Sequence, residues 1–284
     1  MKKILVALCL CCVLASYSFG AGFSLKLSGG LSYLMGGDYN DIIQGRTDYY
    51  HSEPNLSISS DLKKLNLSWN AGAEAIMLFT DSLGVGLGVG YISASNESTM
   101  SGTLLGIIAL ADTYRPTISA VPITLNFHFF LPIGPAMNVH FFAGPGVYFG
   151  SVKFENEVSI PLFVTDTTIS IKPEGSTAFG FQGGLGLEIG LSGNIFLTLD
   201  VQGRVASFSE LKGPWTATGT FIGVPISLSG TGTLWYTETP NSGTYYANWD
   251  IAATQPTGIG VQNVHAASFS LSGVSAQLGF RIAL

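Results

Sequence analysis

Large apolar residues alternate with small or polar residues over eight long segments of this chain. Between Leu83 and Tyr91 the odd positions hold leucine, valine or tyrosine, and the even positions hold glycine. Successive side chains of a strand point to opposite faces, so a period of two predicts strands whose two faces meet different surroundings. The eight segments span residues 22–35, 67–79, 83–93, 117–130, 139–151, 177–191, 195–207 and 267–284.

The chain is poor in charge rather than in apolar residues. Of its 284 residues, 46% are hydrophobic and 11% are charged; the net charge is -6 and the mean hydropathy is +0.39. This composition excludes intrinsic disorder, and the acidic balance argues against nucleic-acid binding. Past residue 20 there is no apolar run of the roughly 18 to 20 residues that a spanning helix requires. The strands themselves are therefore the candidate membrane spans.

The first twenty residues have the layout of a secretory signal peptide. Lys2 and Lys3 precede the apolar stretch Ile4–Ala15, and Ser18 and Gly20 place small residues before a cut ahead of residue 21. The alternatives are an N-terminal membrane anchor, against which the short apolar run argues, and lipid attachment to a cysteine. We interpret residues 1–20 as the signal peptide and residues 21–284 as one barrel domain. The signal holds every cysteine of the chain, which excludes disulfides from the mature domain: Cys9, Cys11 and Cys12.

Short and long connections alternate between the eight segments. The short ones fall near residues 80–82, 132–138 and 192–194, and the long polar ones near 36–66, 94–116, 152–176 and 208–266. An up-and-down meander puts all short turns at one end and all long loops at the other. The sequence thus predicts an all-β fold, a transmembrane antiparallel up-and-down barrel of eight strands. Weak alternation in residues 221–228 and 233–237 could instead add two strands, which would give a barrel of ten.

The charges within the strands all fall in the phase opposite to the large apolar residues. A soluble barrel would turn that second face to water and carry many lysines and glutamates there, whereas this face is mostly glycine, serine and threonine. We therefore expect it to line a narrow lumen, in which three acids and three bases form a network that plugs the barrel. An ion path or a catalytic carboxylate pair is the alternative. The six residues are Lys26, Glu74, Glu188, Asp200, Arg204 and Arg281.

Two predictions concern neighbours within the lumen. Glu188 and Asp200 flank a short turn at similar distances, so we expect them side by side, with Arg204 and Arg281 as partners. His128 and His140 share the inward phase and lie equally far from Gly134, so they could face each other as a metal or pH-sensing pair, or simply fill the lumen. The sequence gives no reason to expect a bound metal or cofactor.

The long loops are acidic, and the last one is rich in aromatic residues. These residues either pack on themselves in a hairpin above the membrane or form a surface patch for a glycan, a protein or a hydrophobic solute. His51 and His265 also lie in long loops. The aromatic set is Trp215, Trp235, Tyr236, Tyr245, Tyr246 and Trp249.

Three passages resemble the small outer-membrane β-barrel proteins of Gram-negative-type envelopes, in the style of OmpA, OmpW and the opacity proteins. They are residues 122–126 (PITLN) with 141–149 (FFAGPGVYF), residues 183–188 (GGLGLE) with 199–204 (LDVQGR), and the last eight residues. The last passage resembles the C-terminal assembly signal, except that it ends in leucine where the family usually has an aromatic residue. Its matching positions are Gln277, Gly279, Ile282 and Leu284.

The resemblance implies an outer-membrane location, with lipids and the barrel-assembly machinery as partners. It also implies a non-enzymatic role in envelope structure, surface interaction or, as in the OmpW style, passage of small hydrophobic solutes. No P-loop, H-E-x-x-H or G-x-S-x-G motif is present, and the glycines at 84–90 alternate as in a strand rather than opening a helix. A lipid-modifying or proteolytic barrel enzyme remains the alternative, which would need a histidine at the rim.

Overall fold

The computed structural model describes most of the region predicted to be the mature domain. The described residues are 22–53, 56–104, 108–160, 164–171, 176–221, 224–241, 243–258 and 260–284. The predicted signal peptide, residues 1–20, lies outside them. Among the described residues, no helix combines the length and the hydropathy that a membrane span requires.

Eight of the described strands close into an antiparallel ring. The order around it is β1, β3, β4, β6, β7, β9, β10 and β16, and β16 pairs back onto β1. These strands coincide with the eight alternating segments, so the prediction of an eight-stranded barrel is confirmed. Their bounds are β1 Gly22–Leu34, β3 Leu67–Leu78, β4 Leu83–Ser95, β6 Ile108–Gly134, β7 Met137–Ile160, β9 Ser176–Ser192, β10 Ile195–Phe208 and β16 Gly273–Ala283.

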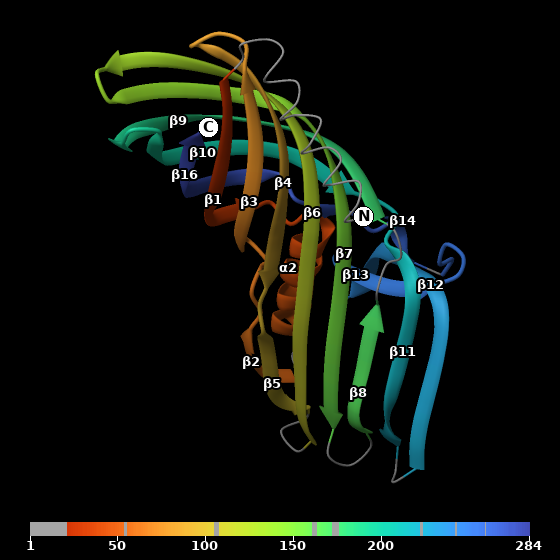
Figure 1. Cartoon of the computed structure of the whole chain (residues 1–284). Helices are drawn as coiled ribbons and strands as arrows, with labels where there is room; N and C mark the ends of the chain where they lie inside the picture. The colour runs from red at the N-terminus through yellow and green to blue at the C-terminus, as the bar shows by residue number, and fades with distance from the viewer. Residues whose placement is uncertain are drawn as a thin grey trace.

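The two ends of the ring differ as the connection lengths predict. The hairpins β3–β4, β6–β7 and β9–β10 turn tightly at one end, which is uppermost in Figure 1. At the other end β6 and β7 continue far beyond the ring. There the described parts of the long connections contain strands and a helix, and these strands extend the sheet.

The extension is an eight-stranded sheet built outward from β6 and β7. β5 and β2 follow β6 on one side, and β8, β11, β12 and β13 follow β7 on the other. The described residues between 212 and 252 therefore join this outer sheet and do not enter the ring, which settles the choice between eight and ten strands. The bounds are β2 Leu56–Asp61, β5 Ser98–Leu104, β8 Val164–Ile171, β11 Lys212–Phe221, β12 Val224–Asn241 and β13 Thr244–Ala252; the short strands β14 Gln262–Ala266 and β15 Phe269–Ser270 pair with β12 and β10.

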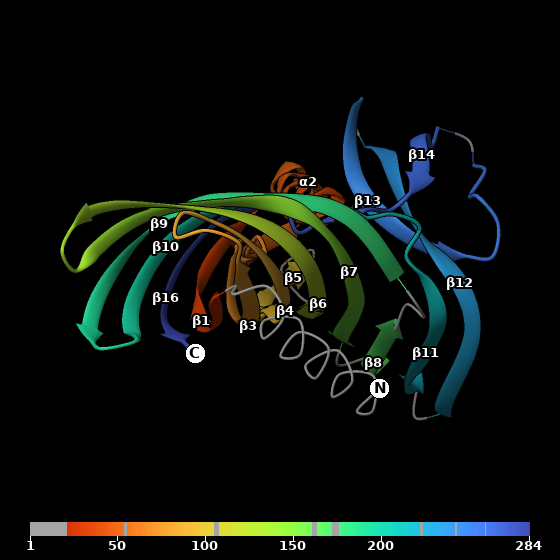
Figure 2. The same ribbon diagram turned by 45° about the horizontal axis from the view of Figure 1, so that its top comes forward.

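The helix α2, Asp38–Ser52, lies between the two edges of the outer sheet. It contacts β13 at one edge and β2 at the other, and Figure 2 shows it beside β13. Gly45 allows the close approach to β13, because a Cβ at this position would lie 2.6 Å from the backbone N and O of Ala247. The helix thus covers the seam that the outer sheet leaves open.

The two faces of the ring strands differ as the alternation predicts. In β1, Ser24 and Lys26 are 0% and 6% exposed, whereas Leu25 and Leu27 are 37% and 49% exposed. The polar side chains therefore point into the lumen and the apolar ones outward. An outward apolar face of this kind is stable in lipid and not in water.

Candidate functional site: the lumen network and the core under α2

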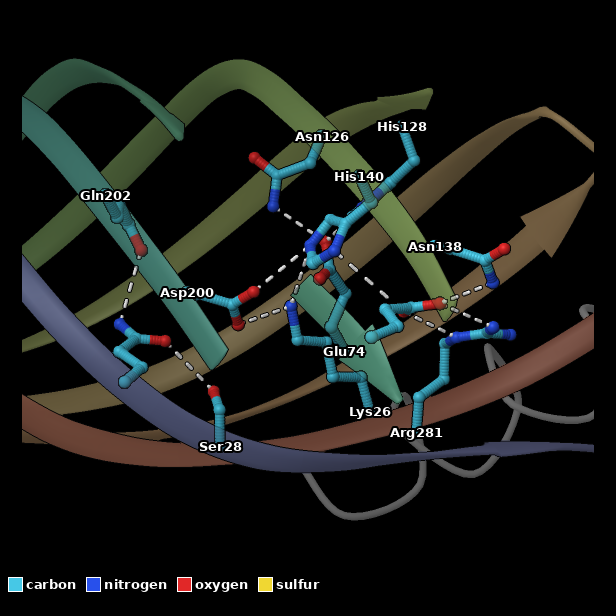
Figure 3. A network of polar contacts seen from close by, with 12 residues as sticks. Lys26, Ser28, Glu74, Asn126, His128, Asn138, His140, Asp200, Gln202 and Arg281 are labelled. Atoms are coloured by element: carbon cyan, nitrogen blue, oxygen red, sulfur yellow. Dashed lines mark hydrogen bonds and ion pairs between the residues drawn. The ribbon is translucent and has the colours of Figure 1, made fainter. Parts of the chain in front are cut away.

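Lys26, Asp200 and His140 meet inside the lumen, and three different strands supply them (Figure 3). Lys26 Nζ lies 2.7 Å from Asp200 Oδ2, and His140 Nε2 lies 3.2 Å from Asp200 Oδ1. None of the three residues is more than 6% exposed. A lone buried ion costs several kcal/mol, so this packing requires the pairing that is seen. Gly186 makes the room, because a Cβ there would collide with Asp200 Oδ1 and with the ring of His140.

Arg281 and Glu188 form a second buried ion pair. Arg281 Nε and Nη2 donate to the two carboxylate oxygens of Glu188 over 2.8 Å and 2.7 Å, and Arg281 Nη1 donates to Ser24 Oγ over 3.1 Å. The guanidinium also lies over the ring of Phe196, 4.2 Å from its centroid. This is the bidentate geometry in which arginine binds a carboxylate most strongly.

Glu74 is held by neutral or weakly basic partners. Asn126 Nδ2 donates to Glu74 Oε1 over 2.7 Å, and His128 Nε2 lies 3.0 Å from the same oxygen. His128 and His140 lie side by side on β6 and β7, with ring centroids 6.2 Å apart. Phe130 and Phe142 complete the stack on both histidines. Among the described residues, no group of three or more His, Cys, Asp or Glu side chains could hold a metal ion.

A chain of amide side chains continues the network towards the outer end. Gln182 donates to Asn126 over 3.1 Å, Gln202 to Gln182 over 2.7 Å and Gln277 to Gln202 over 3.3 Å. Ser28 donates to Gln277 over 3.1 Å, and Figure 3 shows this end of the chain. These residues come from five different strands, so the hydrogen bonds cross-link the ring from within.

Arg204 is arranged differently from the expectation. It is 6% exposed, and its Nε donates to the backbone O of Leu271 over 3.0 Å. No carboxylate of the described residues lies within 4.0 Å of its guanidinium, and the cation beside Asp200 is Lys26 instead. Arg204 follows Asp200 by four residues on β10, which places it about 13 Å further along the strand.

An apolar core lies under α2, on the outer side of this network. Tyr39, Ile42 and Ile43 of α2 are at most 8% exposed and face inward from one side of the helix. They pack with buried residues from the ring, from β12 and from the segments beside β15. Among these are Leu34, Ile92, Ile118, Tyr148, Val152, Phe154, Phe208, Leu211, Leu234 and Phe269.

Polar contacts fix both the start of α2 and the segment that follows it. Asp38 Oδ2 accepts hydrogen bonds from Ser268 N over 2.7 Å and from Ser268 Oγ over 3.0 Å, and lies 3.2 Å from His265 Nε2. Asn40 Oδ1 accepts a hydrogen bond from Leu65 N over 2.8 Å. A carboxylate in the first turn also interacts favourably with the helix dipole.

A buried carboxylate lies against α2 on the outer part of β6. Asp112 is 6% exposed and accepts a hydrogen bond from the Tyr114 hydroxyl. In strand register, Ser119 of β6 lies level with Trp69. Asp112 precedes Ser119 by seven residues, which places it about 23 Å further towards the outer end of the molecule. Burial raises the pKa of Asp112 to about 6, although the nearby Arg46 guanidinium acts in the opposite direction.

The sequence pattern of a known family, described as outer membrane protein beta-barrel domain, matches residues 52–224. The chain belongs to this family. It is therefore an integral outer-membrane β-barrel protein of a Gram-negative bacterium, as the resemblance implied. A crystal structure of the outer membrane protein OprG from Pseudomonas aeruginosa is similar over 92% of this chain and 95% of that chain, with 12% identity and a TM-score of 0.36. No curated protein matches the sequence.

The outward face of this outer-membrane barrel carries aromatic residues near both ends. Tyr33, Trp69 and Tyr91 are 62%, 51% and 40% exposed and lie near the outer end, where the rings of Trp69 and Tyr91 are 5.2 Å apart. Phe79 and Phe129 are 57% and 43% exposed near the short turns. Such bands mark the two interfaces of the lipid layer.

The six aromatic residues of the last long connection do not gather in one exposed patch. Tyr236 is buried in the outer core, and Trp249 packs on the same core and against Phe154 with ring centroids 5.2 Å apart. Trp215 also packs against the core, Trp235 donates to the backbone O of Ala252, and the Tyr246 ring contacts Tyr49. Of the six, Tyr245 is exposed, at 44%. Their burial follows from α2, which gives the outer sheet an apolar partner.

At the rim of the barrel, His265 lies next to Asp38. His51 lies exposed in the last turn of α2. Ser268 Oγ donates to Asp38 and not to His265. A serine nucleophile needs a hydrogen bond to its base. The three side chains are therefore arranged as an anchor for α2, with the carboxylate at the centre.

The C-terminal strand closes the ring, and the four positions of the predicted assembly signal have different surroundings. Gln277 points into the lumen and joins the amide chain, and Gly279 is buried there. Ile282 pairs with Leu25 and Ile195 of the two neighbouring strands. Leu284 is 75% exposed.

Sequence reasoning missed the residues of α2 and of the outer part of β6. A signal for the helix was present, because Tyr39, Ile42 and Ile43 have helical spacing after Asp38 and two glycines. The signal is weak because the rest of the segment is polar. Nothing local marks Asp112 as buried, since its burial depends on α2.

Proposed function

We propose that this outer-membrane protein is a closed barrel that anchors an ordered sheet at the cell surface. Its role on this proposal is envelope structure and surface contact rather than transport. The observation that carries the proposal is a buried ion-pair and amide network in the lumen, with an apolar core under α2 on its outer side. Opening a path for a solute would require breaking both.

Export and assembly complete this proposal. Residues 1–20 direct secretion and are removed, and the C-terminal strand engages the barrel-assembly machinery. The outer sheet, β2 to β13 with α2, then stands outside the cell, because the short turns of such barrels face the periplasm.

Reconstitution in planar lipid bilayers tests the closure. The full mature chain is expected to give no single-channel steps, while a general porin inserted under the same conditions conducts. Stable conductance steps from the unmodified chain would overturn the proposal. The contact role is tested by replacing residues 212–252 with a short turn. The ring should still assemble, and cells carrying this variant should lose envelope resistance to detergents or adherence to a surface.

Passage of small hydrophobic molecules is the second candidate, and one observation favours it. An almost entirely apolar cavity lies between α2 and the barrel wall, lined among others by Ile42, Ile43, Phe154, Leu234 and Trp249. Vesicles containing the protein would then take up a small hydrophobic dye faster than empty vesicles, and Ile42→Trp, which fills the cavity, would abolish the gain. Equal uptake by loaded and empty vesicles would exclude this role.

We further propose that the protein is not an enzyme. The arrangement of Asp38, His265 and Ser268 supports this, since Ser268 is turned to the carboxylate. Cells carrying a double His51→Ala, His265→Ala variant should have the same lipid A and the same hydrolytic activity as cells carrying the unmodified chain. Lipid A or a peptide processed by the unmodified chain but not by the variant would restore the enzyme hypothesis.

A further inference from the structure

A polar chamber lies within the lumen on the side of the amide chain. Its cavity volume is about 80 Å³, whereas a single water takes up about 10–15 Å³ on the same scale. The chamber can therefore hold a group of several atoms. The side chains that matter for its chemistry are Lys26, Asn70, Gln182, Gln202, Arg204 and Gln277.

Arg204 is a buried cation at this chamber, and no carboxylate of the described residues lies within 4.0 Å of its guanidinium. Its guanidinium has five N–H donors, and a single hydrogen bond, from Nε to the O of Leu271, is found among the described residues. Each lumenal carboxylate already has another partner, which for Glu74 is the imidazole of His128. Asp200 contacts Lys26, Glu188 contacts Arg281 and Glu74 contacts His128. A lone buried guanidinium is costly unless something else in the cavity compensates its charge.

The amides around Arg204 present further donors. Gln182, Gln202, Gln277 and Asn70 each use their amide nitrogen in one hydrogen bond, to Asn126, Gln182, Gln202 and Ser32 respectively. A side-chain amide carries two N–H groups, so each retains one beyond that bond. Glu74 is the one carboxylate that lines the chamber, and Asn126 and His128 already hold it.

We propose that this chamber binds a small oxyanion, of the phosphate, sulfate or carboxylate class, between the Arg204 guanidinium and the neighbouring amide N–H groups. The planar guanidinium matches two oxygens of such an anion at once, which a halide cannot reproduce. Lys26 also lines the chamber but is already paired with Asp200, so Arg204 supplies the charge for the anion. The bound anion completes the network that fills the lumen.

Stability of the intact chain in detergent gives the first test, because a ligand of the folded state raises the unfolding midpoint. Phosphate and chloride are titrated in parallel at matched ionic strength. The midpoint should rise with phosphate and saturate, and chloride should raise it less. In Arg204→Met the rise should disappear, and without added phosphate this variant should be at least as stable as the unmodified chain.

Arg115→Met is the matched control, since Arg115 lies outside the ring and pairs with Glu97 and Glu157. It should retain the full phosphate response. Should Arg204→Met not fold, Arg204→Lys keeps the charge but not the planar fork, and it should weaken phosphate binding at least tenfold. A flat response of the unmodified chain, an equal response to chloride, or a response unchanged by the Arg204 variants would each overturn the proposal. Anomalous diffraction from selenate at Arg204 would locate the anion directly.

Discussion

At the scale of single residues, the face on which a lumenal side chain lies and the partner that it contacts are determined separately. Each of the six charged side chains lies on the inward face of its strand, as the phase of the alternation predicts. The partners depend on the stagger of the strands. Lys26 reaches Asp200 across β16, whereas Arg204 on the same strand as Asp200 is too far along it. Strand stagger cannot be derived from alternation alone.

The pair of Arg281 and Glu188 should contribute strongly because both partners are buried. Arg281→Met leaves a buried carboxylate without its cation and should cost about 3–5 kcal/mol of unfolding free energy. Adding Glu188→Leu should recover most of this loss, since an apolar pair carries no charge to desolvate. Urea unfolding of the folded chain in lipid vesicles measures both variants.

Arg115→Met serves as the control for this prediction as well. Its ion pairs with Glu97 and Glu157 lie on exposed side chains. Exposed pairs contribute little to stability, so this variant should unfold near the unmodified midpoint. A double variant as unstable as Arg281→Met alone would show that packing, and not the unpaired charge, causes the loss.

At the scale of elements, α2 determines the structure of the outer sheet. The sheet has two free edges, β2 and β13, and the helix lies between them. Its inward residues create the core that buries Tyr236 and partly buries Trp249. An element that the sequence marks weakly thus determines which aromatic side chains are available at the surface.

Enlarging Gly45 should separate α2 from β13. In Gly45→Val the added side chain meets the backbone of Ala247, so the helix must shift, and overpacking of this kind costs about 1–3 kcal/mol. Limited proteolysis of intact cells should then cleave near α2, while the ring remains folded. Gln44→Val, at the neighbouring exposed position, should stay resistant. Equal resistance of both variants would indicate that the contact does not hold the helix in place.

The buried Asp112 should make the stability of the outer sheet depend on pH. Its pKa is raised from 3.8 to about 6, so the folded state binds more protons than the unfolded state between these values. Stability therefore falls as pH rises from about 4 to about 6 and then levels off, by roughly 3 kcal/mol at most. Asp112→Asn should remove this dependence.

Hydrogen exchange of the α2 and β6 amides between pH 4 and pH 8, corrected for intrinsic rates, measures the effect of Asp112. Asp61→Asn is the control, because the Asp61 side chain is 67% exposed. It should leave the pH dependence intact. The same slope in Asp112→Asn as in the unmodified chain would assign the dependence to another group.

At the scale of the whole molecule, the ring and the outer sheet share β6 and β7. These strands carry the lipid-facing surface at one end and the outer core at the other, so the barrel is a rigid base for the outer sheet. The absence of cysteine after residue 12 allows the orientation to be tested with single cysteines.

Ser227→Cys on the exposed part of β12 should react with a membrane-impermeant maleimide in intact cells. Asp81→Cys, in the short turn between β3 and β4, should react after the outer membrane is permeabilised. The unmodified chain is the control for background labelling. The opposite pattern would reverse the assigned orientation.

The sequence by itself determined the eight spans, their inward and outward faces, and the closure of the ring. These properties are local, because each strand has to present one face to lipid and the other to its neighbours in the lumen. The tertiary structure alone decided the partners of the lumenal ions, the unpaired Arg204 and the burial of the aromatic loop residues. Those depend on strand stagger and on a helix packing against strands almost two hundred residues away, and no short stretch of sequence encodes either.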